Sequence, residues 1–184
     1  MSASPPQLRP YRGHTPRLET STYVDPQATV IGDVTIGADS SVWPQCVLRG
    51  DVNRIRVGAR TNIQDATIVH VTHPHAGEPE GHATVIGDDV TIGHRVIVHG
   101  CTIEDRCLIG MGSILLDGAV LRRNVLLGAG SLVTEGKELE GGYLWMGRPA
   151  RRVRRLTEAE LAWLSYSAAH YVRLKETYLN PLNP

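Results

Sequence analysis

Large aromatic side chains are scarce in this sequence: phenylalanine is absent from its 184 residues, and aromatic residues make up 5% of them. With so few rings, a broad globular core cannot be filled in the usual way. The 19 glycines and the many Val, Ile and Leu residues suit instead a thin, repetitive core of aliphatic side chains.

Other absences exclude whole classes of protein. Lys plus Arg and Asp plus Glu both number 19, so the basic excess typical of nucleic-acid-binding proteins is missing. No apolar run approaches the roughly 18 residues that span a membrane, so we expect no membrane partner. The first ten residues lack the apolar stretch of a secretory signal, which favours a cytoplasmic protein. Cys46, Cys101 and Cys107 are odd in number and show no CxxC spacing, which is typical of small buried side chains.

The central part of the sequence repeats with a period of six residues. Aliphatic residues recur at this step in groups of three, and irregular steps occur only between groups. The groups are Ile36, Val42 and Leu48; Val57, Ile63 and Val69; Ile86, Ile92 and Val98; Ile103, Ile109 and Leu115; and Leu121, Leu127 and Val133. In a parallel β-helix each hexapeptide forms a short strand and a corner, and three hexapeptides close a triangular coil. A β-sandwich would show period two, so we expect an all-β helix over residues 21–150, with these aliphatic side chains inside.

The remaining segments interrupt or flank this repeat. We expect residues 1–20 to form an arm, and residues 72–84 to form a loop, rich in glycine, proline and polar residues, that leaves the coil. Residues 151–184 should contain a linker and one α-helix at about 157–178, because Thr157-x-x-Glu160 is a capping box and apolar residues follow it at helical spacing. A glycine often follows the inward aliphatic residue, as Gly37 does, where it either relieves crowding or adopts a positive φ.

Three histidines take positions in this register that suit a shared metal ion. His70 and His99 are each the second residue of a third hexapeptide, in adjacent coils, so they should stack on one outer face about 4.8 Å apart. His94 is the third residue of a second hexapeptide, near a corner, where it reaches a neighbouring subunit more readily than its own pair. Threefold packing of such prisms would unite two histidines of one chain with one of the next. Three protein ligands leave a position open for water, as catalytic zinc sites do.

Several segments resemble the γ-class carbonic anhydrases and their close relatives. They are residues 49–51 (RGD), 62–65 (NIQD), 69–70 (VH) and 93–100 (GHRVIVHG), and the resemblance covers roughly residues 20–178. It implies a left-handed turn of the parallel β-helix and a homotrimer with a metal at each interface, usually zinc, with Fe²⁺ or Co²⁺ as alternatives. The implied reaction is the reversible hydration of CO₂ to bicarbonate by a metal-bound hydroxide, with His70, His94 and His99 as ligands.

The same resemblance implies roles for residues around the metal. Gln64 would orient the hydroxide by hydrogen bonding, and Asn62 would place bicarbonate or support Gln64. Arg49 and Asp51 resemble an ion pair between subunits, for which the bidentate guanidinium is well suited. Asp65 would either bond across the interface or hold a ligand.

The proton relay is the least defined part of the resemblance. The family prototype carries a longer acidic loop with a glutamate shuttle, and Glu78 and Glu80 do not align with it securely. Tyr143 is another candidate relay near the site. His73, His75 and His82 lie on the loop, where they are either solvated or relay protons. We expect His14 and His170 to be ordinary surface residues.

Three other functions compete with CO₂ hydration. A hexapeptide acyltransferase shares the coil but does not need three histidines in metal geometry. An acyl-CoA thioesterase would use the same metal-activated hydroxide on a thioester. A catalytically weak, metal-stabilised trimeric scaffold would keep the metal without fast turnover, which the missing shuttle favours.

Overall fold

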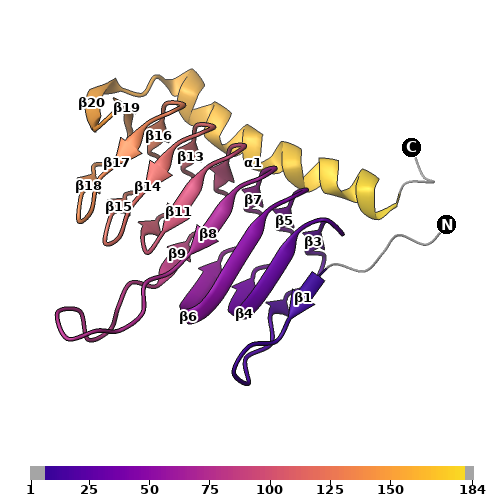
Figure 1. Cartoon of the computed structure of the whole chain (residues 1–184). Coiled ribbons are helices and arrows are strands. Elements are labelled where there is room, and N and C mark those ends of the chain that lie inside the picture. Colours follow the sequence, from indigo (N-terminus) through magenta and orange to yellow (C-terminus); the bar gives the residue numbers. More distant parts are fainter. Residues whose placement is uncertain (1–6, 181–184) are drawn as a thin grey trace.

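A computed structural model describes residues 7–180, which form a triangular prism of stacked coils with one helix along a side (Figure 1). One side, called the helix face, is an eight-stranded sheet. Its strands are β3 (Tyr23–Val24), β5 (Ser41–Val42), β7 (Asn62–Ile63), β10 (Thr91–Ile92), β13 (Leu108–Ile109), β16 (Leu126–Leu127), β19 (Tyr143–Gly147) and β20 (Ala150–Arg155).

The other two sides are joined into a twelve-stranded sheet by two long strands that run around a corner, β4 (Thr29–Ile36) and β6 (Val47–Val57). The histidine face carries β8 (Ile68–His70), β11 (Ile97–His99), β14 (Ile114–Leu115) and β17 (Leu132–Val133). The third face carries β9 (Thr84–Ile86), β12 (Thr102–Ile103), β15 (Val120–Leu121) and β18 (Glu138–Leu139). β1 (Gln7–Arg9) and β2 (Arg17–Leu18) pair with β4 in parallel.

The register of the parallel strands follows the six-residue period. On the histidine face Val69 pairs with Val98, and Val98 with Leu115; on the helix face Ile63 pairs with Ile92, and Ile92 with Ile109. All the inward aliphatic residues predicted from the repeat are buried. The prediction of a left-handed parallel β-helix of hexapeptide repeats with a C-terminal helix is confirmed.

The repeat continues beyond the five predicted groups at both ends, almost entirely within the predicted range 21–150. Before the first predicted group, Leu18, Val24 and Val30 have the same step of six and pair with Ile36, Val42 and Leu48. After the last group, Leu139 and Trp145 pair with Leu121 and Leu127. Part of the predicted arm, residues 7–18, therefore lies on the body, and residues 1–6 fall outside the described part. The linker predicted from residue 151 is wrong: β20 pairs there with β19 as an antiparallel hairpin.

The corners explain why small and polar residues recur between the strands. The fourth residue of most hexapeptides has a positive φ, for example Asp39, Arg60, Asp89, Arg106 and Asn124 at one corner. The glycine in the second position of a hexapeptide has a different role. A Cβ on Gly37 would lie 2.6 Å from the carbonyl carbon of Gly58 in the next coil, so crowding and not backbone conformation requires glycine there.

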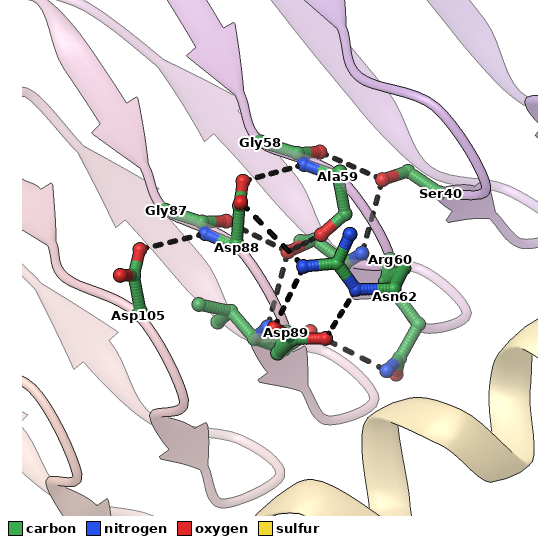
Figure 2. Close-up of polar contacts among 11 residues, drawn as sticks. Ser40, Gly58, Ala59, Arg60, Asn62, Gly87, Asp88, Asp89 and Asp105 are labelled. Atoms are coloured by element: carbon green, nitrogen blue, oxygen red, sulfur yellow. Dashed lines mark hydrogen bonds and ion pairs between the residues drawn. The ribbon is translucent and has the colours of Figure 1, made fainter. Parts of the chain in front are cut away.

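Carboxylates tie successive coils together at this corner (Figure 2). Oδ1 of Asp88 accepts a hydrogen bond from the backbone N–H of Ala59 at 2.8 Å, and Oδ1 of Asp105 accepts one from the N–H of Asp88 at 3.0 Å. Arg60 donates twice to the Asp89 carboxylate, at 2.7 and 2.9 Å. The bonds from Ala59 and Asp88 satisfy backbone donors at positions where the strands are too short to do so.

The C-terminal helix α1 (Glu158–Leu179) begins at the predicted capping box, with Thr157 accepting from the Glu160 N–H and the Glu160 carboxylate accepting from the Thr157 N–H. It packs on β5, β7 and β10 of the helix face, where Leu164, Ser167 and Ala168 are buried. Within residues 7–180, no helix is long and apolar enough to cross a membrane.

Candidate metal centre

Two of the predicted metal ligands face each other on the histidine face. The parallel register of β8 and β11 places His70 directly opposite His99. Nδ1 of His70 lies 3.0 Å from Nε2 of His99, and the two side chains are 18% and 33% exposed. The predicted stacking of these imidazoles in one outward column is therefore present in a single chain.

A carboxylate holds the outer nitrogen of each ring. Nε2 of His70 lies 3.1 Å from Oδ1 of Asp51, and Nδ1 of His99 lies 2.6 Å from Oδ1 of Asp117. An ionised carboxylate only accepts, so each of these ring nitrogens carries the proton. The two nitrogens that face each other then both present lone pairs, an arrangement that a divalent cation would stabilise. Carboxylate–histidine pairs of this kind orient the histidines of zinc sites, so this donor set fits a metal ion.

The electrostatics favour the state of His70 that binds metals. Burial lowers the pKa of His70 below its ordinary value, and the nearby Arg49 charge adds to this effect. Burial would raise the pKa of Asp51 and of Asp117, but hydrogen bonds outweigh it: Arg49 and His70 hold the pKa of Asp51 low, and Thr72 and His99 that of Asp117. A neutral imidazole at His70 and ionised carboxylates at Asp51 and Asp117 are the forms that metal binding requires.

The third predicted ligand, His94, lies apart from this pair. It follows β10 at the corner between the helix face and the histidine face, and its side chain is 47% exposed. Its Nδ1 is 2.9 Å from Oδ2 of Asp65, so Nε2 is the nitrogen left for a metal. Across residues 7–180 of a single chain, no three His, Cys, Asp or Glu side chains converge as metal ligands. Whether a second subunit brings its His94 to the pair stays a prediction.

Gln64 and Asn62 lie on the helix face at the same corner as His94. Nε2 of Gln64 donates to Oδ1 of Asn62 at 3.1 Å, and Nδ2 of Asn62 donates to Oγ1 of Thr91 at 3.0 Å. Both side chains are buried beneath α1. Gln64 also lines a cavity of about 470 Å³ between the sheet and the helix, together with Met111, Tyr166 and other residues.

Comparisons with known proteins agree with this geometry. Residues 83–115 match the bacterial transferase hexapeptide family (six repeats), and residues 100–135 match the hexapeptide repeat of succinyl-transferase. Protein YrdA of Escherichia coli (strain K12) is 52% identical over 176 residues, which is 96% of each chain. A protein named probable carbonic anhydrase from Methanocaldococcus jannaschii is 51% identical over 82% of this chain and 90% of its own length. The chain belongs to the γ-class carbonic anhydrase-like family.

A solved structure of the same kind supports the placement of the coils. The hexapeptide transferase family protein from Anaplasma phagocytophilum superposes with a TM-score of 0.87 and is 46% identical, covering 94% of this chain and 98% of that one. The fold and the order of the coils are thus those of a known structure.

The ion pair that the family resemblance implied is formed inside one chain. Arg49 stands one coil before His70 in the same column, because Leu48 pairs with Val69. Its guanidinium lies 2.5 Å from Oδ2 of Asp51, whose other oxygen faces His70. Whether the pair also crosses to another subunit stays a prediction. Asp65 contacts the ring of His94, as the second of its two predicted roles requires, and a bond across an interface stays a prediction.

The predicted proton relays are not brought together at the histidines of one chain. The Glu78 carboxylate lies 3.6 Å from Nε2 of His82 and lines a separate polar cavity that also contains Asp117. Glu80 is exposed, and its backbone carbonyl accepts from Asn53. Tyr143 belongs to β19, three strands away from β10 on the helix face, so its predicted place near the histidines is wrong within one chain. Its ring packs instead against the guanidinium groups of Arg152 and Arg155.

One carboxylate of the centre was missed by the sequence analysis. Asp117 comes from the coil after His99, one residue beyond Leu116, which occupies the column of the two histidines. The register could have placed it near that column. Its hydrogen bond to His99 depends on the path of the chain around the corner, which the period does not define.

Proposed function

We propose that this protein is a carbonic anhydrase that reversibly converts CO₂ and water to bicarbonate and a proton, as a cytoplasmic homotrimer. A divalent metal, zinc in the first place and Fe²⁺ or Co²⁺ as alternatives, would be held by His70 and His99 of one subunit and by His94 of the next. The observation that carries the proposal is the pair of facing imidazole nitrogens, each made available by a carboxylate on the opposite side of its ring. The carbonic anhydrase names of relatives that match most of this chain support the same reaction.

When bound in such a site, zinc lowers the pKa of a coordinated water from 15.7 to about 7, so that hydroxide is available near neutral pH. The protein's own residues prepare the site for this chemistry. Asp51, Asp117 and Asp65 each accept from one ring nitrogen and thereby direct the other nitrogen of that ring. These contacts fix the ring orientations that a bound metal ion would require.

Gln64 is oriented as a hydrogen-bond acceptor. The Val90 carbonyl can only accept, so the Asn62 amide nitrogen faces it at 3.4 Å, and the Asn62 oxygen turns toward Gln64. Gln64 therefore presents its NH₂ group to Asn62, and its Oε1 has no partner among residues 7–180. That oxygen is free to accept a hydrogen bond from a water molecule. Such a hydrogen bond would orient the water so that one of its lone pairs faces the carbon of CO₂.

The surface around the histidines suits contact with a second copy of the chain. Ile68 and Ile97 flank the pair on the histidine face and are 38% and 39% exposed. Adjacent outward aliphatic residues of this size favour burial in an interface. A neighbour that covers them would also bring its own corner, with His94 and Gln64, toward His70 and His99.

Metal stoichiometry in a histidine variant tests this proposal. We predict about one metal per chain in a trimer purified without chelator, and loss of most of it in His94→Ala, because two remaining imidazoles hold a divalent ion far less tightly. The measurements are metal analysis and sedimentation, with His14→Ala as the matched control at an exposed histidine that is not a proposed ligand. CO₂ hydration by stopped flow should fall with the metal. A His94→Ala trimer that keeps one metal per chain would contradict the shared site.

The match to transferase hexapeptide families keeps an acyltransferase as a second candidate. Chelation separates the two, because an acyltransferase that relies on a histidine base retains activity without metal. Assay of acyl-CoA hydrolysis on the same metal-loaded protein tests the thioesterase alternative. Full metal occupancy with only background turnover of both substrates would favour the scaffold.

A further inference from the structure

The loop between β8 and β9, residues 71–83, is attached at its base to the candidate metal centre. It begins directly after His70, and Thr72 pairs with His82 as an antiparallel bridge with backbone hydrogen bonds of 2.9 and 3.0 Å. The side chain of Asn53 donates to the carbonyl oxygens of Thr72 and Glu80, at 3.1 and 2.9 Å. The base of the loop is thus held in place, while its tip projects from the body of the coil (Figure 1).

A single carboxylate connects this base to a histidine. The hydroxyl of Thr72 donates to Oδ2 of Asp117 at 2.5 Å, and Oδ1 of the same carboxylate faces Nδ1 of His99 at 2.6 Å. Because a carboxylate is planar, a hydrogen bond at one oxygen restricts the direction of the other. The Thr72 hydroxyl therefore limits how Asp117 can present itself to His99.

We propose that Thr72 is a positioning residue: through Asp117, the base of the loop sets the ring orientation and tautomer of His99. The proposal rests on the proposed function only in treating His99 as a metal ligand. A closed loop base keeps the proton on Nδ1 of His99 and points Nε2 toward His70. Opening of the base would release Asp117 and weaken the hold on the ring, so the loop and the metal affinity are coupled.

The hydroxyl can be removed without a change of shape. Thr72→Val deletes the donor but keeps the branched side chain, and Thr72→Ser restores the donor. Thr102→Val is the matched control, since Thr102 points outward from β12 and its hydroxyl has no hydrogen-bond partner among residues 7–180. Asp117→Ala removes the whole connection and should give the largest effect.

The first readout needs neither metal nor activity. In metal-free protein labelled with ¹⁵N-histidine, the imidazole shifts of His99 report which ring nitrogen carries the proton. We expect the Nδ1–H form to dominate in the unchanged protein, in Thr72→Ser and in Thr102→Val, and to lose population in Thr72→Val.

The second readout is Co²⁺ affinity, followed by the visible absorption of the bound ion. Changes to groups that support a metal ligand cost 10–100-fold in affinity, so we expect about 10–100-fold weaker binding for Asp117→Ala and at most about tenfold for Thr72→Val. Wild-type values in Thr72→Val for both readouts would overturn the proposal, as would a Thr72→Ser variant as impaired as Thr72→Val. If the unchanged protein binds no Co²⁺, the proposed function fails, and the histidine shifts alone still decide the role of Thr72.

Discussion

Each histidine of the proposed centre has its own carboxylate: Asp51 for His70, Asp117 for His99 and Asp65 for His94. A neutral imidazole has one donor and one acceptor nitrogen, so a carboxylate on one side leaves a lone pair on the other. All three rings are thus held with one nitrogen left free, as the proposed shared metal requires. This consistency supports a common metal more strongly than the presence of histidines does.

The cysteines of the core provide a prediction at the level of single side chains. Burial raises the pKa of Cys46, Cys101 and Cys107 to about 12 in each case, and the thiolate is the reactive form. We predict that iodoacetamide at pH 8 leaves all three unlabelled in the folded protein and labels all three after unfolding. Mass spectrometry measures the labelling. Modification of the folded protein at the rate of a free thiol would contradict the packing described here.

Among the secondary-structure elements, α1 depends most on local sequence. Its first turn is fixed by the Thr157–Glu160 capping box, and the Glu160 carboxylate also binds the guanidinium of Arg154 at 2.7 and 2.8 Å. The helix covers Asn62 and forms one wall of the cavity beside Gln64. Fraying of the first turn of α1 would therefore loosen the packing of the helix over Asn62 and Gln64.

We predict that Thr157→Ala destabilises the first turn of α1 by about 1 kcal/mol, because the N-cap oxygen that accepts from the Glu160 N–H is lost. Hydrogen exchange of the amides in that turn measures the effect directly. Thr177→Ala, the same substitution near the other end of the helix, should leave these amides unchanged. Equal exchange in both variants would mean that packing, and not the cap, holds the turn.

The molecule as a whole is a stack in which each coil contacts its neighbours. Stability in such a solenoid is a sum of terms for single coils and for the contacts between them. The inward column has no large rings before Trp145, so every aliphatic residue fills a comparable share of a narrow core. Substitution of any one of them should weaken two neighbouring contacts at once.

We predict that Val133→Ala, at a fully buried inward position of β17, lowers the free energy of unfolding by about 2–3 kcal/mol, from lost burial and a residual cavity. Val85→Ala makes the same change on β9 at a side chain that is 37% exposed, and it should cost about 0.5 kcal/mol or less. Denaturant unfolding at one protein concentration compares the two. Similar losses would argue against a core confined to the inward column.

The six-residue period was enough to predict the fold class, the inward aliphatic column and the pairing of His70 with His99, because strand register in a β-helix follows directly from spacing along the chain. It did not place Leu18 in the coil or predict the strand at residues 150–155, which pairs antiparallel to β19 and so lies outside the parallel repeat. The contacts of Asp117 with His99 and Thr72, and the distance of Tyr143 from the histidines, depend on how loops and corners return to the coil. Such contacts join residues up to 45 positions apart through side-chain geometry, which a local pattern does not encode.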